Sequence, residues 1–242
     1  MKRVQFLILF LLPLSLLYAQ NPDLSGIWKV EGENPEEVKY DGTLTMKKQS
    51  KVHYTLNWNI DYEHQEQKLK YPGTAIFDTE SEKMYAAYGV ETFRYGLIVY
   101  ELNEYGGLAG RASWTSHKGM GTELIAGQLG KRKVAGTYEV AGKRSKGAVE
   151  LGVSETYSGT LKVIQKENRF DLQWFLGDGQ PYTGFAYRVG DQLIGVWGIG
   201  DSYGMEMYQF DDQLKSATSE WVSPAYDYAK GLEYIEKTSS DE

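Results

Sequence analysis

The stretch GIWKVEG at residues 26–32 recurs about 110 residues later as GTYEVAG at residues 136–142. Residues 42–44, Gly-Thr-Leu, recur in the same way at 159–161. Further aromatic and acidic residues recur in the same order in both halves. The matched pairs are Tyr40 and Tyr157, Trp58 and Trp174, Tyr88 and Trp197, Tyr95 and Tyr203, Tyr100 and Tyr208, and Glu123 and Glu233. An ordered series at one nearly constant shift is typical of internal duplication. The chain is therefore predicted to contain two copies of one unit.

Each copy divides into about eight short strands separated by Gly, Asn, Asp and Ser. In residues 53–60 apolar and polar side chains alternate, which predicts a strand with one buried face. Leu97 to Tyr100 is continuously apolar and predicts a strand covered on both faces, whereas its counterpart around Met205 and Met207 alternates and is expected nearer solvent. The prediction is an all-β chain of two tandem repeats, each of about eight antiparallel strands in a barrel-like arrangement, with a β-sandwich or one joint barrel as alternatives.

The beginning of the chain has the order of a secretory signal peptide. Lys2 and Arg3 precede an apolar run at 4–17, and the small residue Ala19 follows at the expected cleavage site. The apolar run is shorter than the roughly 20 residues of a membrane-spanning helix. The predicted segments are a signal peptide at 1–19, repeat 1 at 20–126, a linker at 127–133, repeat 2 at 134–237 and a disordered tail at 238–242. We expect a periplasmic or secreted protein with no membrane insertion after signal cleavage.

The composition argues against several classes of function. The net charge of −7 disfavours nucleic acid and anionic membrane surfaces as partners. The chain has no cysteine, so disulfides, thiolate metal sites and cysteine nucleophiles are excluded. The three histidines, His53, His64 and His117, are too scattered to indicate a metal site. We therefore expect no metal and no cofactor.

The stretch LSGIW at residues 24–28 resembles the opening strand of calycin barrels, the superfamily of lipocalins and avidins. The resemblance covers five residues and implies a structural role for Trp28 at the closed end of a barrel, and by duplication for Tyr138. It carries no ligand residues to this chain. The whole pattern also resembles duplicated secreted bacterial β proteins of unassigned function.

Aromatic residues are the candidates for ligand binding, because Tyr and Trp combine an apolar face with a hydrogen-bonding edge. The candidate ligand-binding residues are Tyr95, Tyr203, Tyr88, Trp197, Tyr100 and Tyr208, of which Tyr95 and Tyr203 are expected near solvent because each opens a strand beside a glycine. Trp58 and Trp174 are predicted to be structural core residues. Glu123 and Glu233 are predicted to complete the same local hydrogen bonds in each copy, with a pseudosymmetric catalytic carboxylate pair as the alternative.

No serine-nucleophile elbow, phosphate loop or calcium loop is evident, and no catalytic residue is assigned. The preferred hypothesis is an exported non-enzymatic protein that binds a small apolar or glycan-like ligand, or a protein partner at its surface. The alternatives are an adhesin-like protein-interaction module and a hydrolase with a carboxylate site.

Overall fold

The computed structural model describes residues 22–63, 68–90, 95–102, 112–116, 119–126, 133–150, 152 and 154–238. The predicted signal peptide, most of the predicted linker and residues 239–242 lie outside these ranges. No helix in the described part of the chain has the length and apolar character needed to cross a membrane.

Strands dominate both copies, as the sequence predicts. The first copy contains β1 (Gly26–Glu33), β2 (Lys39–Lys48), β3 (His53–Tyr62), β4 (Leu69–Asp78), β5 (Lys83–Gly89), β6 (Tyr95–Glu101), β7 (Ala112–Ser116) and β8 (Gly119–Ala126). The second contains β9 (Gly136–Lys143), β10 (Thr156–Lys166), β11 (Arg169–Leu176), β12 (Pro181–Val189), β13 (Gln192–Gly198), β14 (Tyr203–Phe210), β15 (Ser216–Val222) and β16 (Lys230–Lys237). The short helix α1 (Lys146–Val149) and the 3₁₀ turn η1 (Pro224–Tyr226) interrupt the second copy.

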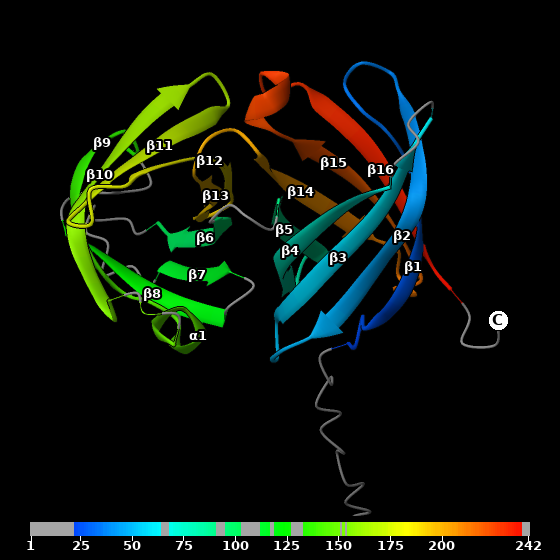
Figure 1. Cartoon of the computed structure of the whole chain (residues 1–242), viewed down its shortest axis with the longest axis horizontal. Helices are drawn as coiled ribbons and strands as arrows, with labels where there is room; N and C mark the ends of the chain where they lie inside the picture. Colours follow the sequence, from blue (N-terminus) through cyan, green and yellow to red (C-terminus); the bar gives the residue numbers. More distant parts are fainter. Residues whose placement is uncertain are drawn as a thin grey trace, which may run out of the picture.

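The strands form two closed antiparallel barrels, and the two copies exchange strands to build them (Figure 1). Barrel A consists of β1–β5 with β14–β16, and barrel B consists of β9–β13 with β6–β8. We expected each repeat, 20–126 and 134–237, to be its own barrel-like unit. That part of the expectation is wrong, because the last three strands of each copy complete the barrel of the other.

The exchange occurs at equivalent places in the two copies. β5 pairs with β14, so that Gly89 lies opposite Tyr203, and β13 pairs with β6, so that Gly198 lies opposite Tyr95. The four strands β5, β6, β13 and β14 lie where the barrels meet (Figure 1). Each chain segment that enters the other barrel thus starts at the centre of the molecule.

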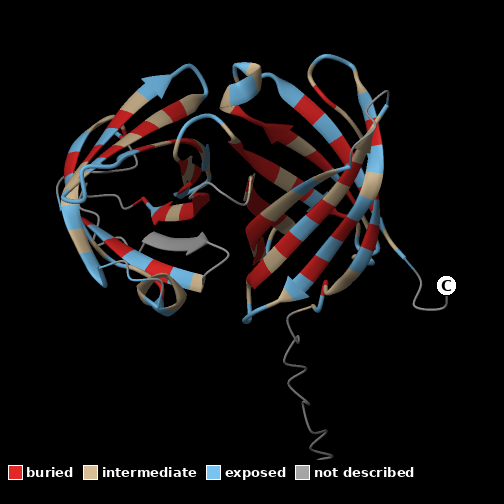
Figure 2. Ribbon diagram, in the orientation of Figure 1, coloured by how far each residue is buried: buried red, intermediate tan, exposed pale blue. Residues whose placement is uncertain are grey.

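An apolar cluster joins the outer faces of these central strands. Its buried members are Tyr85, Ala87, Tyr95, Leu97, Phe185, Ile194, Val196, Tyr203, Met205 and Val222. Leu97, Ile98 and Tyr100 on β6 are buried, which agrees with the expectation for this apolar run, and the central strands are largely buried in Figure 2. The expectation for the counterpart strand is wrong, since Met205 packs between the barrels and Glu206 is buried inside barrel A.

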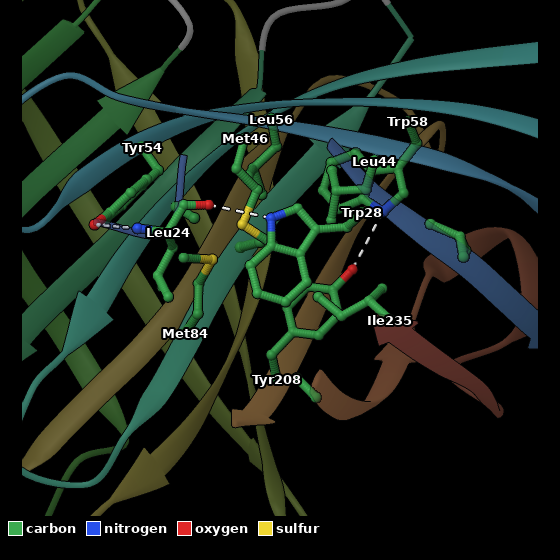
Figure 3. Packing of buried hydrophobic residues seen from close by; sticks show 14 of the residues in the cluster. Leu24, Trp28, Leu44, Met46, Tyr54, Leu56, Trp58, Met84, Tyr208 and Ile235 are labelled. Carbon is green, nitrogen blue, oxygen red and sulfur yellow. Dashed lines mark hydrogen bonds between the residues drawn. The ribbon is translucent and has the colours of Figure 1, made fainter. Parts of the chain in front are cut away.

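The interior of barrel A contains a second apolar cluster, in which Trp28 is fully buried (Figure 3). The Trp28 Nε1 donates a hydrogen bond to the Leu24 carbonyl oxygen at 3.1 Å. In barrel B the Tyr138 hydroxyl donates to the Val134 carbonyl oxygen at 2.8 Å, across the same sequence separation. These matched bonds place the two aromatic residues at equivalent positions in the two barrels.

Residues 53–60 alternate as predicted, with one exception. Tyr54, Leu56, Trp58 and Ile60 are buried in the barrel A core. His53, expected on the wet face, is buried as well, and its Nε2 hydrogen-bonds to the Thr74 Oγ1 at 2.8 Å. A polar partner on β4 thus allows the imidazole to leave water.

Candidate functional site

A cavity of about 510 Å³ occupies one end of the interior of barrel A. Its walls come from strands of both copies, so the strand exchange itself assembles them. Eight aromatic side chains line the cavity: Tyr40, Trp58, Tyr62, Tyr71, Tyr88, Tyr203, Trp221 and Tyr226. Three acidic residues also line it: Glu36, Glu206 and Glu233.

The aromatic lining is continuous around Tyr88. Its ring lies edge-on to Trp58, Tyr71 and Trp221, at centroid distances of 6.1, 6.1 and 6.3 Å. Edge-to-face contacts of this kind fix ring orientation. The cavity therefore has an ordered apolar wall with hydroxyl and indole donors at defined positions.

Glu233 on β16 is held by three hydrogen-bond donors. The Trp58 Nε1 donates to Oε1 at 3.3 Å and the Tyr40 hydroxyl to Oε2 at 3.1 Å, while the Tyr208 hydroxyl also donates to Oε1. The Trp221 Nε1 in turn donates to the Tyr40 hydroxyl oxygen at 2.9 Å. Three donors on one carboxylate stabilise its charged form and oppose the effect of burial.

Glu206 on β14 is the second buried carboxyl, and its side chain shares a hydrogen bond with Glu233. The Ser219 Oγ donates to the Glu206 Oε1 at 2.6 Å. Only 3% of Glu206 and 6% of Glu233 is exposed. Burial, followed by the charge of Glu233, raises the pKa of Glu206 well above its ordinary value.

The pKa of Glu233 is also raised by burial, but more hydrogen bonds oppose the rise than in Glu206. Burial raises the pKa of Glu233, and the bonds from Tyr208, Trp58 and Tyr40 oppose the rise. Because Glu233 accepts three of these hydrogen bonds and Glu206 accepts one, from Ser219, we assign the charge of the pair to Glu233 and the proton to Glu206. Within the described part of the chain, no Lys, Arg or His lines the cavity or forms an ion pair with either carboxyl.

Barrel B repeats only half of this arrangement. Glu123 accepts bonds from the Tyr100 hydroxyl at 2.6 Å, the Tyr157 hydroxyl at 2.8 Å and the Trp174 Nε1 at 3.4 Å. The position equivalent to Glu206, three residues after the matched Tyr95, is Ile98. The buried glutamate with three donors is thus common to both barrels, and Glu206 is an addition in barrel A.

The structure divides the predicted ligand-binding residues between different environments. Tyr88 and Tyr203 line the barrel A cavity, and Tyr208 hydrogen-bonds to Glu233. Tyr100 and Trp197 belong to the interior of barrel B. The Tyr95 hydroxyl donates to the Pro72 carbonyl oxygen at 2.6 Å, and the ring lies in the cluster between the barrels.

The expectation that Tyr95 and Tyr203 lie near solvent is wrong. Their exposed fractions are 1% and 3%. Each ring lies over the glycine that ends the preceding strand, where a Cβ on Gly89 or Gly198 would come within 2.7 or 2.4 Å of it. The sequence suggested a barrel mouth, but the strand exchange moves these strand openings to the centre of the molecule.

Two residues that were predicted to be structural also belong to the cavity. Trp58 and Glu233 are buried as expected for structural residues, but both line the cavity. Glu123 and Glu233 lie in different barrels, so they do not form the catalytic pair considered as an alternative. The acidic partner of Glu233 is Glu206. The sequence signal that could have identified Glu206 is the difference between the two aligned copies, which have Glu at position 206 and Ile at position 98.

No group of three or more His, Cys, Asp or Glu residues suited to a metal ion occurs among the described residues. No protein-family model, curated protein or solved structure matches the chain. The barrel A cavity is therefore the feature of this molecule that indicates a function.

Proposed function

We propose that the protein binds a small molecule in the cavity of barrel A and is not an enzyme. The observation that carries the proposal is the ordered aromatic cavity of about 510 Å³ with two buried carboxyls in its wall. A volume of this size is within the usual range of small-molecule sites, which are mostly apolar and contain a few placed polar groups. The ligand-binding role proposed for Tyr88 and Tyr203 belongs to this cavity.

The calycin resemblance and the predicted export signal fit the same proposal. Calycin barrels hold ligands inside a closed barrel, and Trp28 lies at the end of barrel A away from the cavity lining.

The proposed location is the periplasm or the extracellular medium. Amino-terminal sequencing of exported protein should begin at Gln20, and retention of Met1 would exclude cleavage.

The ligand can be sought by native mass spectrometry of the intact protein purified from the cells that make it. We expect a retained small molecule, which is then extracted and titrated into variants. Trp58→Phe should weaken binding by at least about tenfold, because it removes a donor and part of the cavity wall.

Trp174→Phe is the matched control, since it removes the equivalent indole donor from Glu123 in barrel B. It should leave the affinity unchanged. Equal losses in both variants would indicate a general effect on folding. The absence of any retained or extracted ligand, with no binding by probe compounds, would exclude a binding function for the cavity.

A hydrolase is the second candidate, because two carboxyls that share a proton are a known arrangement for acid–base catalysis. Glycoside hydrolysis fits poorly, since its carboxyls stand about 5 Å apart or more, whereas Glu206 and Glu233 are hydrogen-bonded. Mass spectrometry of the extracted ligand during incubation with the protein distinguishes the two functions. Chemical conversion that Glu206→Gln abolishes would favour the hydrolase.

A further inference from the structure

Glu206 has no counterpart in barrel B, although the two barrels share the same strand arrangement. In barrel B the equivalent glutamate, Glu123, is satisfied by three donors without a second carboxyl beside it. Ile98 occupies the position of Glu206 there and is buried. Ser219, which donates to Glu206, matches Ala112 in the aligned sequence. Barrel A thus has a polar pair where the other copy has two apolar residues.

We propose that the cavity of barrel A binds a small organic cation, a protonated amine whose ammonium group takes the place of the proton between Glu206 and Glu233. This inference rests on the proposed binding function and specifies its ligand. The amine N–H groups donate to the two carboxylates, and the apolar body of the ligand packs against the tyrosine and tryptophan rings.

The charge distribution supports a cation over other ligands. Three carboxyl groups line the cavity, and the described lining includes no basic side chain. An anionic ligand would enter a site of like charge, which costs free energy in a low-dielectric interior. Aromatic rings also attract cations through their negative faces, and this attraction strengthens when the cation is desolvated.

Apart from the exposed Glu36, the other titratable residues that line the cavity or bond to the pair are tyrosines. They are Tyr40 on β2, Tyr62 on β3, Tyr71 on β4, Tyr88 on β5, Tyr203 and Tyr208 on β14, and Tyr226 in η1. Burial raises the pKa of Tyr40, Tyr62, Tyr71, Tyr88, Tyr203 and Tyr208, so these hydroxyls stay neutral near pH 7. Among these residues, Glu206 and Glu233 are then the buried groups whose charge can respond to a bound cation.

Binding of an amine should release the proton from Glu206. An ammonium group keeps its charge between pH 5 and pH 8, whereas Glu206 must lose its proton to form the ion pair. The affinity should therefore rise with pH, by up to about tenfold per pH unit while Glu206 is protonated in the free protein. A neutral ligand should show no such rise.

The probes are 2-phenylethylamine and tryptamine, with 2-phenylethanol as the uncharged analogue of the first and 3-phenylpropionate as an anion. We expect calorimetric titration to detect the amines and to show the alcohol and the anion at least about tenfold weaker. Glu206→Gln keeps the side-chain shape and should reduce amine affinity by at least about tenfold and remove its pH dependence. Glu206→Ile, the residue of barrel B, should have the same effect.

Glu123→Gln is the control for loss of a buried carboxyl elsewhere and should leave amine binding unchanged; near-ultraviolet circular dichroism checks that each variant is folded. Equal affinity for the amine and the alcohol, full affinity in Glu206→Gln, or no binding by either amine would overturn the cation proposal. Retention of an uncharged ligand by the native protein would do the same and leave the binding function intact. If no probe and no extracted compound binds, both proposals fail.

Discussion

Glu206 shows what a single residue contributes in a duplicated fold. The residue is 3% exposed, and its carboxyl interacts with that of Glu233 and has no basic partner in the described part of the chain. Burial and a nearby like charge both disfavour ionisation, so the folded state holds this proton more tightly than the unfolded chain. The free protein is therefore less stable at a pH where Glu206 must ionise.

We predict that Glu206→Gln makes the protein more stable above about pH 5 and flattens its pH dependence. The folded-state pKa of Glu206 is raised, so the stability from its bound proton is complete below the unfolded-state pKa of 4.5 and is lost as pH rises. One such proton changes the unfolding free energy by about 1.4 kcal/mol per pH unit within this window. Urea unfolding at several pH values measures the effect, and a wild type that gains stability relative to the variant between pH 5 and pH 8 would contradict it.

Residue roles were predictable from sequence where they follow from the repeat, and not where they depend on strand partners. The matched positions of Trp28 and Tyr138 end in matched hydrogen bonds to Leu24 and Val134. Tyr95 and Tyr203 also match, but their burial comes from the other barrel. No local pattern contains that information.

At the scale of the strand, the repeated Gly-Thr-Leu motif marks a close approach between neighbours. Gly42 on β2 and Gly159 on β10 lie opposite Ile60 and Leu176. A Cβ on Gly159 would lie 2.1 Å from the Phe175 carbonyl oxygen, and one on Gly42 would lie 2.2 Å from that of Asn59. Only glycine allows the two strands to keep this separation.

We predict that Gly159→Ala destabilises the protein by about 1–3 kcal/mol, because backbone atoms must move to accept the new methyl group. Gly177→Ala is the control, since the atom nearest to a new Cβ there is the Ser158 carbonyl oxygen at 4.0 Å and Gly177 is exposed. Thermal unfolding of both variants measures the difference. A Gly159→Ala protein as stable as Gly177→Ala would show that the strands can separate without cost.

The strands themselves were well predicted, but their partners were not. The alternation of residues 53–60 places Tyr54, Leu56 and Trp58 in the core as expected. Hydrophobic periodicity determines which face of a strand is buried, whereas it does not determine whether β13 pairs with β14 or with β6. Residues 199–202 connect β13 to β14 and could equally have closed a hairpin, so the exchange is a property of the tertiary structure.

At the scale of the whole molecule, the exchange makes the two barrels interdependent. Each barrel takes five strands from one copy and three from the other. The cluster between the barrels buries Phe185, Val196 and Met205, which a separated copy would expose to water. Burial of such side chains favours association at about 25 cal/mol per Å² of apolar surface. Two copies linked in this way should behave as one cooperative unit.

We predict that the chain can be divided between β8 and β9 without loss of the fold. Residues 22–126 and 133–238, coexpressed as separate chains, should assemble into a 1:1 complex, because each barrel requires strands from both fragments. Native mass spectrometry gives the stoichiometry, and calorimetry should show one unfolding transition rather than two. The outcome that contradicts the exchange is a pair of fragments that purify separately as folded monomers, since that requires each copy to close its own barrel.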